Sequence, residues 1–423
     1  MGRMPPPELP RWPFTAMFVL FPVWWILGPG EAMWIVLAGV MVFFLLRSGR
    51  IRVPRGFGLW LIFLVWMLFS VIGIDSSGRL IGFVYRALLY LTVTVIFVYV
   101  YNARSSLTPR YIAGVLSVFW AIVMVGGYVG VLFPLLAFTT PLSAVIPDSI
   151  ASNELVQEMV RRRVTQYNPD AFMPLEPRPS APFLYTNGWG NAYSVLTPIF
   201  VAYLVEVRRE RRFWWLAALL PLSFLPAFLT LNRGMFIGIG LALAYVAVRA
   251  IVRGHLRVLI GLTAIVAMAA MVFAVFPVAD RLTDRLASSP STEDRASLYQ
   301  ETFERTLEAP VFGYGAPRPS ESPGAPAAGT QGQVWMVLFS HGFAGLFFFL
   351  AWLVWAFVRS IRVRDPVLVA ANAVLLVVIV QSTYYSILTT GLAVAMIAAA
   401  VTLRPVDDPA EPAIERPREE IAV

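Results

Sequence analysis

The chain of 423 residues contains no cysteine, no lysine and only two histidines, His255 and His341. The absence of cysteine excludes disulfides, thiolate metal sites and cysteine nucleophiles, and two histidines are too few for a histidine-rich metal site. Charge is also scarce, since charged residues make up 14% of the chain, whereas a soluble globular chain has about a quarter. These absences argue against a soluble enzyme.

What the chain has in abundance is apolar sequence, with 58% hydrophobic residues and a mean hydropathy of +0.71. Apolar stretches of about 17 to 25 residues, the length that crosses a bilayer, recur along it. They predict an all-α polytopic membrane protein with about twelve transmembrane helices. The predicted spans are residues 14–28, 31–46, 57–74, 81–101, 111–133, 183–205, 213–229, 234–249, 258–277, 333–358, 366–382 and 385–403.

All 33 basic residues are arginine, and their placement orients the predicted spans. Cytoplasmic loops carry an excess of basic residues, and the short basic connections all fall on the side of the N-terminus. We therefore expect a multi-pass protein of the inner (cell) membrane with both termini in the cytoplasm. The expected regions are a cytoplasmic N-tail (1–13), transmembrane helices 1–5 (14–133), extracytoplasmic loop 1 (134–182), transmembrane helices 6–9 (183–277), extracytoplasmic loop 2 (278–332), transmembrane helices 10–12 (333–403) and a disordered cytoplasmic tail (404–423).

The first large loop contains a segment with helical periodicity. Residues 149–164 predict a short amphipathic helix with Ile150, Leu155 and Met159 near one face. The arginine run Arg161–Arg163 at its end is interpreted as a solvated helix face or an anchor for lipid headgroups.

The second large loop shows the same pattern. Residues 292–307 predict a helix with Leu298, Phe303 and Leu307 near one side, and a Gly/Pro-rich loop follows it. The predicted span at 333–358 is overlong for a bilayer, so we expect its first part to lie outside the hydrocarbon. Long ordered loops on one face of a bundle usually carry function.

Two arginines stand where lipid is expected. Arg86 lies a few residues into a predicted span, and Arg233 occupies the tight outer turn between two spans. An arginine in hydrocarbon is costly and usually faces a partner or an aqueous cavity, although Arg86 is near enough to the interface to snorkel. With Arg178 and Arg295 in the outer loops, these cations favour an anionic ligand, above all a phosphate.

Four segments in order along the chain resemble one family. Residues 178–193 have an Arg, a small residue, then Phe and Asn just inside a span, and residues 230–234 form a Thr-x-x-Arg-Gly turn. Residues 295–315 have the pattern Arg…Tyr…Pro-x-x-Gly-x-Gly, and residues 331–345 begin the tenth span. Over roughly residues 80–400 the chain resembles the O-antigen ligase and polymerase superfamily.

The resemblance implies an integral-membrane glycosyltransferase of the GT-C type that needs no nucleotide sugar and no cofactor. Its donor would be a glycan on undecaprenyl diphosphate at the outer leaflet, and its acceptor a lipid or a cell-wall glycan. A ligase transfers the glycan to the acceptor, and a polymerase extends it by a repeat unit. Both share these motifs, so both stay open. The expected partners are donor, acceptor and membrane lipids, without nucleic acid.

One departure from the family concerns the residue that activates the acceptor. The tenth-span motif of the family opens with a His, where this chain has Gln331. A glutamine accepts and donates hydrogen bonds but is no base near neutral pH. His341, ten residues on, is a second candidate, with a satisfied buried histidine as the alternative. Glu293, Asp294, Glu308 or the leaving diphosphate itself would otherwise take the proton.

Displacing a diphosphate from a sugar needs charge stabilisation of the leaving group, which arginines supply without a metal ion. We therefore expect metal-independent transfer, with Arg178 and Arg233 gripping the diphosphate. The predicted site consists of the catalytic residues Arg178, Arg233, Gln331 and His341 and the substrate-binding residues Arg86, Asn187, Arg295, Tyr185 and Trp189. Interfacial aromatics such as the last two are commoner as membrane-belt residues.

Two other classes of function remain open. A transporter of a lipid-linked glycan would also need a cationic cavity, but its sequence would show repeats or broken helices near the midplane, and these are not evident. A catalytically inactive envelope-assembly protein would account for Gln331 in place of His. Formation of a new glycosidic linkage by the purified protein separates an enzyme from both.

Overall fold

The computed structural model describes residues 8–147, 154–167, 177–275, 291–322 and 325–407. In these ranges the chain is predominantly helical and has only four very short strands. The α-helices are α1 (Trp12–Val19), α2 (Phe21–Leu27), α3 (Met33–Ser48), α4 (Phe57–Phe69), α5 (Ser77–Asn102), α6 (Pro109–Leu132), α8 (Glu154–Val160), α9 (Thr186–Glu206), α10 (Arg212–Leu229), α11 (Arg233–Val252), α12 (Leu256–Val275), α14 (Ser291–Glu308), α15 (Gln333–Arg359), α16 (Pro366–Gln381) and α17 (Thr390–Asp407).

Helices occupy all twelve predicted apolar segments, which confirms an all-α polytopic membrane protein. Seven of the described helices are long and apolar enough to cross a bilayer, and the apolar helices around α4, α16 and α17 are shorter. The first predicted span is broken into α1 and α2 at Leu20. The break lies two residues before Pro22, whose ring obstructs a continuous helix.

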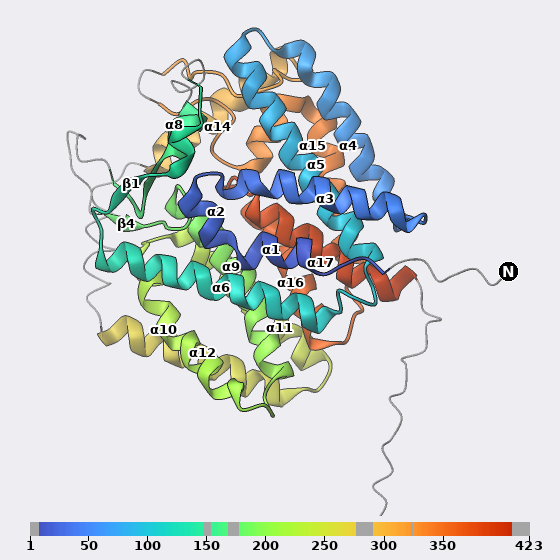
Figure 1. Ribbon diagram of the computed structural model, residues 1–423, viewed down its shortest axis with the longest axis vertical. Helices are drawn as coiled ribbons and strands as arrows, with labels where there is room; N and C mark the ends of the chain where they lie inside the picture. Colours follow the sequence, from blue (N-terminus) through green and yellow to red (C-terminus); the bar gives the residue numbers. More distant parts are fainter. Residues whose placement is uncertain (1–7, 148–153, 168–176, 276–290, 323–324, 408–423) are drawn as a thin grey trace, which may run out of the picture.

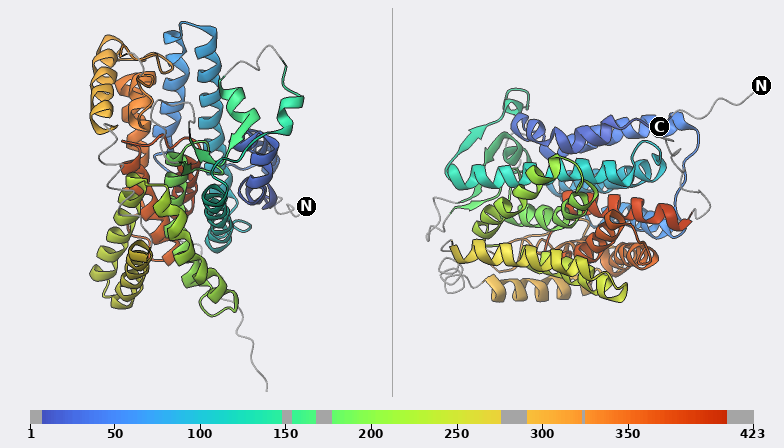
Figure 2. Two further views of the ribbon diagram at one scale, coloured as in Figure 1. Left: turned by 90° about the vertical axis from the view of Figure 1, so that its left-hand side faces the viewer. Right: turned by 90° about the horizontal axis from the view of Figure 1, so that it is seen from below.

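The helices run side by side between two ends of a bundle (Figures 1 and 2). At one end, called the loop end below, lie α8, α14 and two small antiparallel sheets. These sheets pair β1 (Ala137–Thr139) with β2 (Arg161–Arg163), and β3 (Thr165–Gln166) with β4 (Arg178–Pro179). The opposite end holds both ends of the helical chain, because Arg404 of α17 donates a hydrogen bond to Leu107 O, and Ser106 donates to Leu9 O. Both long polar loops therefore share one end of the bundle.

Helix α9 is the central helix and packs against α6, α10, α11, α16 and α17. Its polar side chains are buried in a network in which Asn191 donates to Gln381 Oε1 at 2.8 Å and Gln381 donates to Ser194 Oγ at 2.8 Å. Gly238 of α11 lies directly against Gln381, and a Cβ there would overlap the amide. Small residues at close contacts and buried amides as cross-links are the usual means of joining helices in a bilayer.

Helix α15 is interrupted at Gly342, whose φ of 70° and ψ of −175° are not helical. The overlong predicted span is therefore two helical segments, 333–341 and 343–359. The backbone groups released by the break are satisfied by the 309–315 segment: Tyr314 N donates to Phe339 O at 2.9 Å, and Phe343 N donates to Pro310 O at 3.0 Å. Unpaired backbone groups are costly in an apolar environment. The 309–315 segment is therefore needed to satisfy the backbone of α15 at its break.

The structure corrects two predictions about the loop helices. The helix predicted at 149–164 is described only as α8, and Arg161–Arg163 continue as strand β2 because they pair with β1; Ile150 lies outside the described residues. Helix α14 forms as predicted, but Phe303 and Leu307 are exposed, and Thr302 and Thr306 are buried with Leu298 instead. Both threonines find partners, with Thr306 donating to Thr302 O, so the buried face of α14 is partly polar.

We expect Gly342→Ala to destabilise the protein, because alanine strains a left-handed backbone and its Cβ would overlap the carbonyl oxygens of Pro310 and Val311. Backbone strain of this kind costs on the order of 1–3 kcal/mol, and the overlap adds to it. The measurement is the melting temperature of purified protein in detergent. Gly240→Ala, at a helical position with no atom within 4 Å of the added Cβ, is the matched control and should keep or raise stability. Equal melting temperatures for the two variants would contradict this account of the α15 break.

Candidate functional site

The segment between α16 and α17, residues 382–389, joins the parts of the site at the loop end. Its carbonyls bind the start of α15: Gln333 N donates to Tyr385 O and Val334 N to Ser382 O, both at 2.8 Å. The Tyr385 hydroxyl donates to Asn232 Oδ1, and the Tyr384 hydroxyl donates to Gly234 O at 3.2 Å. This segment therefore holds the N-termini of α15 and α11 against each other.

The turn between α10 and α11 carries the predicted Arg233. Asn232 caps α11 by accepting from Met235 N, and its Nδ2 donates to Thr186 O at 2.9 Å at the start of α9. Leu231 has a φ of 50° and is the only non-glycine residue with a positive φ among the described residues. Strain of this kind persists where the surroundings enforce it, often at functional sites.

Arg178 and Asn187 lie beside this turn. Arg178 on β4 donates from Nε to Thr230 O at 2.8 Å, and Asn232 Nδ2 is 3.5 Å from Asn187 Oδ1. Arg233 is the first residue of α11, and its side chain is exposed. The N-terminus of a helix has a partial positive charge and unpaired N–H groups, so it adds to the positive potential around Arg233.

Helix α14 brings Arg295 and Tyr299 to the same region. The Tyr299 ring stacks on Trp335 with 4.4 Å between ring centroids, and its hydroxyl donates to Gln331 O at 3.0 Å. Burial raises the pKa of Tyr299, and the positive charge of Arg295 opposes this rise. Both Arg295 and Arg178 act electrostatically on Tyr385. Arg178, Arg233, Arg295, Asn187 and Gln331 thus lie around the 382–389 segment.

Arg86 and His341 form a second, deeper cluster. The His341 ring is buried, and its Nδ1 lies 2.7 Å from Ser70 Oγ. Arg86 lies within electrostatic range of His341, and its Nη1 is buried without a hydrogen-bond partner. The position of His341 favours the alternative of a satisfied buried histidine, because its ring is enclosed and its backbone belongs to the broken segment of α15.

Gln333 connects the two clusters and was missed by the sequence analysis. Its Nε2 donates to the Tyr90 hydroxyl at 2.6 Å, one helical turn beyond Arg86, and its Oε1 accepts from Leu388 N at 3.2 Å. Asn232, Tyr385 and Gln333 were all assigned no role from sequence. The second glutamine of the Gln-Gly-Gln segment at 331–333 was the one available signal.

The two predicted aromatic residues lie in different surroundings. Trp189 is completely buried, donates from Nε1 to Val123 O at 2.9 Å and stacks on Tyr193. This burial argues against the predicted stacking of Trp189 on a sugar, because both faces of the indole are packed. Tyr185 is 52% exposed, and its hydroxyl donates to Glu158 Oε1 at 3.1 Å.

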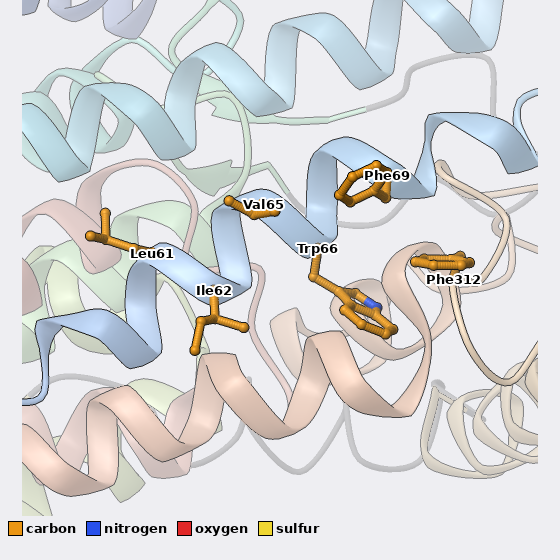
Figure 3. Close-up of a pocket in the computed structure, with 6 residues that line it drawn as sticks. All are labelled: Leu61, Ile62, Val65, Trp66, Phe69 and Phe312. Carbon is orange, nitrogen blue, oxygen red and sulfur yellow. The ribbon is translucent and has the colours of Figure 1, made fainter.

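An apolar groove of about 480 Å³ lies beside the His341 cluster (Figure 3), because Trp66 in its lining donates from Nε1 to His341 O at 3.0 Å. It is lined by Leu61, Ile62, Val65, Trp66, Phe69 and Phe312. Because no polar side chain faces it, the groove suits hydrocarbon and not a phosphate or a sugar. Within the part of the chain that the structure describes, no group of three or more His, Cys, Asp or Glu side chains is arranged to hold a metal ion.

Residues 217–350 match the family model for O-Antigen ligase. The match covers less than half of the chain, from α10 into α15, and includes Arg233, Arg295, Gln331 and His341. It confirms the resemblance to the O-antigen ligase and polymerase superfamily that the four sequence segments predict. No curated protein and no solved structure matches the chain.

We expect Ser70→Ala and His341→Ala to act on stability. Ser70→Ala leaves the buried His341 Nδ1 without its partner, which costs about 1–3 kcal/mol, and His341→Ala adds a cavity beside Phe63 and costs more, on the order of 2–4 kcal/mol. Thermal unfolding in detergent measures both, and folded Ser70→Ala protein should keep its activity. A fully stable but inactive His341→Ala protein would instead assign His341 to catalysis.

Proposed function

Starting from the O-antigen ligase domain at residues 217–350, we propose that the protein transfers a glycan from undecaprenyl diphosphate to a lipid or polysaccharide acceptor. The reaction takes place at the loop end of the bundle, on the outer face of the cell membrane. The observation that carries this proposal is the convergence of Arg178, Arg233 and Arg295 around one turn and one loop. These cations come from three segments far apart in the sequence.

The arginines suit the leaving group of this reaction. When the acceptor oxygen attacks the anomeric carbon, the bond from that carbon to the phosphate oxygen breaks and the diphosphate departs with the electron pair. Fixed positive charges that face the developing negative charge lower the barrier, and arginine matches phosphate oxygens with two parallel N–H donors. Arg233, exposed at the N-terminus of α11, is the arginine we assign most directly to the diphosphate, with Arg178 beside it.

Gln331 and Asn187 suit the neutral part of the substrates. Gln331 lies directly before α15, where Tyr299 binds its carbonyl, and Asn187 lies near Asn232 at the start of α9. An amide side chain orients a hydroxyl group but does not take its proton. In this proposal the departing diphosphate accepts the proton of the acceptor hydroxyl, so no histidine is needed at position 331.

The orientation in the membrane follows from charge. The short basic connections of the sequence lie at the end opposite the loop end, and such connections stay in the cytoplasm. With both termini in the cytoplasm, the arginine-containing site opens to the outside, where glycans on undecaprenyl diphosphate are presented. A repeat-unit polymerase would use the same donor and the same arginines and would differ only in its acceptor.

The transport alternative gains one feature from the structure, the break in α15 at Gly342. That break is closed by hydrogen bonds from the 309–315 segment and does not expose free backbone groups to a central path. Arg178, Arg233 and Arg295 also lie at the loop end and not in the middle of the bundle. These features favour transfer at a membrane face over passage through the bundle.

We expect Arg233→Ala to lower transfer by about 100-fold or more, since removing one preorganised donor to a developing charge typically costs that much. Arg233→Lys keeps the charge but loses the paired donors and should retain about a tenth of the activity. The assay follows the new glycosidic linkage made by purified protein from a glycan on undecaprenyl diphosphate. Arg209→Ala, another exposed arginine outside the site, is the matched control. Wild-type activity in both Arg233 variants would remove this residue from the site.

The same assay tests independence from metal ions. If arginines supply the charge stabilisation, activity should stay within about twofold after dialysis against EDTA, because no divalent ion contributes to the leaving group. A loss that is restored by Mg²⁺ or Mn²⁺ would contradict metal-independent transfer.

A further inference from the structure

A third polar cluster lies at the loop end and has no role in the donor site described above. We define the Glu31 cluster as Glu31, Tyr85, Glu158, Arg162 and Tyr185. These residues come from the connection before α3, from α5, α8 and β2, and from the residue preceding α9. The fold therefore brings together polar side chains from five segments, several of which lie far apart in the sequence.

Arg162 occupies the centre of the Glu31 cluster. It turns inward from β2, donates from Nη2 to Gly28 O at 2.7 Å, and has its Nε buried without a hydrogen-bond partner. Burial lowers the pKa of Arg162, and the negative charge of Glu31 counteracts this. The middle residue of the arginine run is therefore an inward-facing side chain and not part of the solvated face predicted from sequence.

Tyr85 contributes a hydroxyl group to the cluster. Its side chain is half-buried and within electrostatic range of Glu31, Arg162 and Glu158, yet its hydroxyl has no hydrogen-bond partner among the described residues. Buried polar groups without partners are rare, and each requires an explanation. Here one such group, Arg162 Nε on β2, lies in one cluster with the partly exposed Tyr85 hydroxyl of α5, which indicates that a ligand completes their hydrogen bonds.

The composition of the cluster selects the class of ligand. Two carboxylates repel an anion such as the donor diphosphate, and Arg162 repels a cation. Carboxylates and phenols accept hydrogen bonds while guanidinium and phenol groups donate them, which is the mixture that neutral hydroxyl groups require. The half-exposed ring of Tyr185 adds an apolar surface at the edge of the cluster, suited to the face of a sugar ring.

The cluster is also linked to the donor site. Thr389 and Thr390 donate to the Glu31 carboxylate at 3.0 and 2.5 Å. Thr389 directly follows Leu388, whose amide binds Gln333, in the segment that carries Tyr385. The 382–389 segment therefore contacts the Glu31 cluster on one side and the arginine-containing turn on the other.

We propose that the Glu31 cluster binds the neutral sugar of the acceptor through its hydroxyl groups. This inference rests on the proposed transfer reaction and assigns the two substrates to two sides of the 382–389 segment. The diphosphate binds among Arg178, Arg233 and Arg295, and the acceptor sugar binds between α5 and β2. Tyr85 and Glu158 are binding residues in this assignment and take no part in bond formation.

The test measures the apparent KM for the acceptor and the KM for the donor separately in Tyr85→Phe and Glu158→Gln protein. The probe is a total membrane-lipid extract of the source organism as acceptor, titrated at saturating donor, the glycan on undecaprenyl diphosphate. The apparent KM for the extract should rise about 3- to 10-fold in Tyr85→Phe, the effect of one lost hydrogen bond, and at least 10-fold in Glu158→Gln. The kcat and the KM for the donor should stay within twofold. Tyr111→Phe, at the opposite end of the bundle, should change neither KM.

A second measurement does not depend on turnover. Saturation-transfer NMR with a neutral trisaccharide, maltotriose, should detect binding to wild-type and Arg233→Ala protein and a weaker signal with a Tyr85→Phe/Glu158→Gln double variant. An unchanged acceptor KM in both single variants, together with an unchanged NMR signal in the double variant, would overturn the inference. The Arg233→Ala variant tests the transfer reaction separately. Maltotriose binding that depends on the cluster in a protein without transfer activity would instead contradict the proposed function and leave a sugar site.

Discussion

The structure at the loop end depends on hydrogen bonds made by backbone groups that have no partner within their own helix. The first amides of α15 bind the carbonyls of Ser382 and Tyr385, and the carbonyls released at Gly342 bind amides of the 309–315 segment. In an apolar environment such groups must be satisfied inside the protein. These hydrogen bonds determine where the 382–389 and 309–315 segments lie. They thereby also position the side chains that these segments carry.

This requirement changes the interpretation of the family motifs. In the Pro-x-x-Gly-x-Gly segment, residues 310–315, the backbone closes the break of α15, and the side chains carry no charge. The backbone of this motif therefore shapes the loop end of the bundle. The turn at 230–234 is different, because Asn232 anchors it to α9 and to Tyr385 while Arg233 extends outward. Within one family pattern, some residues build the backbone and one presents the charge.

The three polar clusters divide positive and negative charge between them. Arginines gather near the turn of α11, a partly unsatisfied Arg86 lies deeper beside Tyr90, and carboxylates with tyrosines surround Arg162. A transferase needs one place for an anionic leaving group and another for a neutral hydroxyl acceptor. In the proposed reaction, the clusters on the two sides of one short segment would serve these two purposes at a single end of the bundle.

Much of the fold could be predicted from the sequence because hydrophobic length and arginine placement are local signals. All twelve apolar segments are helical, and α14 forms where a helix is predicted, although a partly different face of it is buried. The strand at Arg161–Arg163 was not predicted, because it forms by pairing with β1, a contact between residues distant in the sequence. The break between α1 and α2 was not predicted either. For the candidate site, Arg178, Arg233, Arg295, Asn187 and Gln331 were predicted from motifs and lie near one segment, while Trp189 is packed in the core.

By itself, the sequence determined that this is a helical membrane protein with few charged side chains, and that its exceptional arginines stand beside the motifs of one superfamily. These properties reside in composition and in residues close together along the chain. Only the tertiary structure decided which side chains meet. Tyr385, Gln333, Glu31 and Tyr85 carry no distinctive local pattern, and they gain their importance from hydrogen bonds and charges supplied by segments up to several hundred residues away.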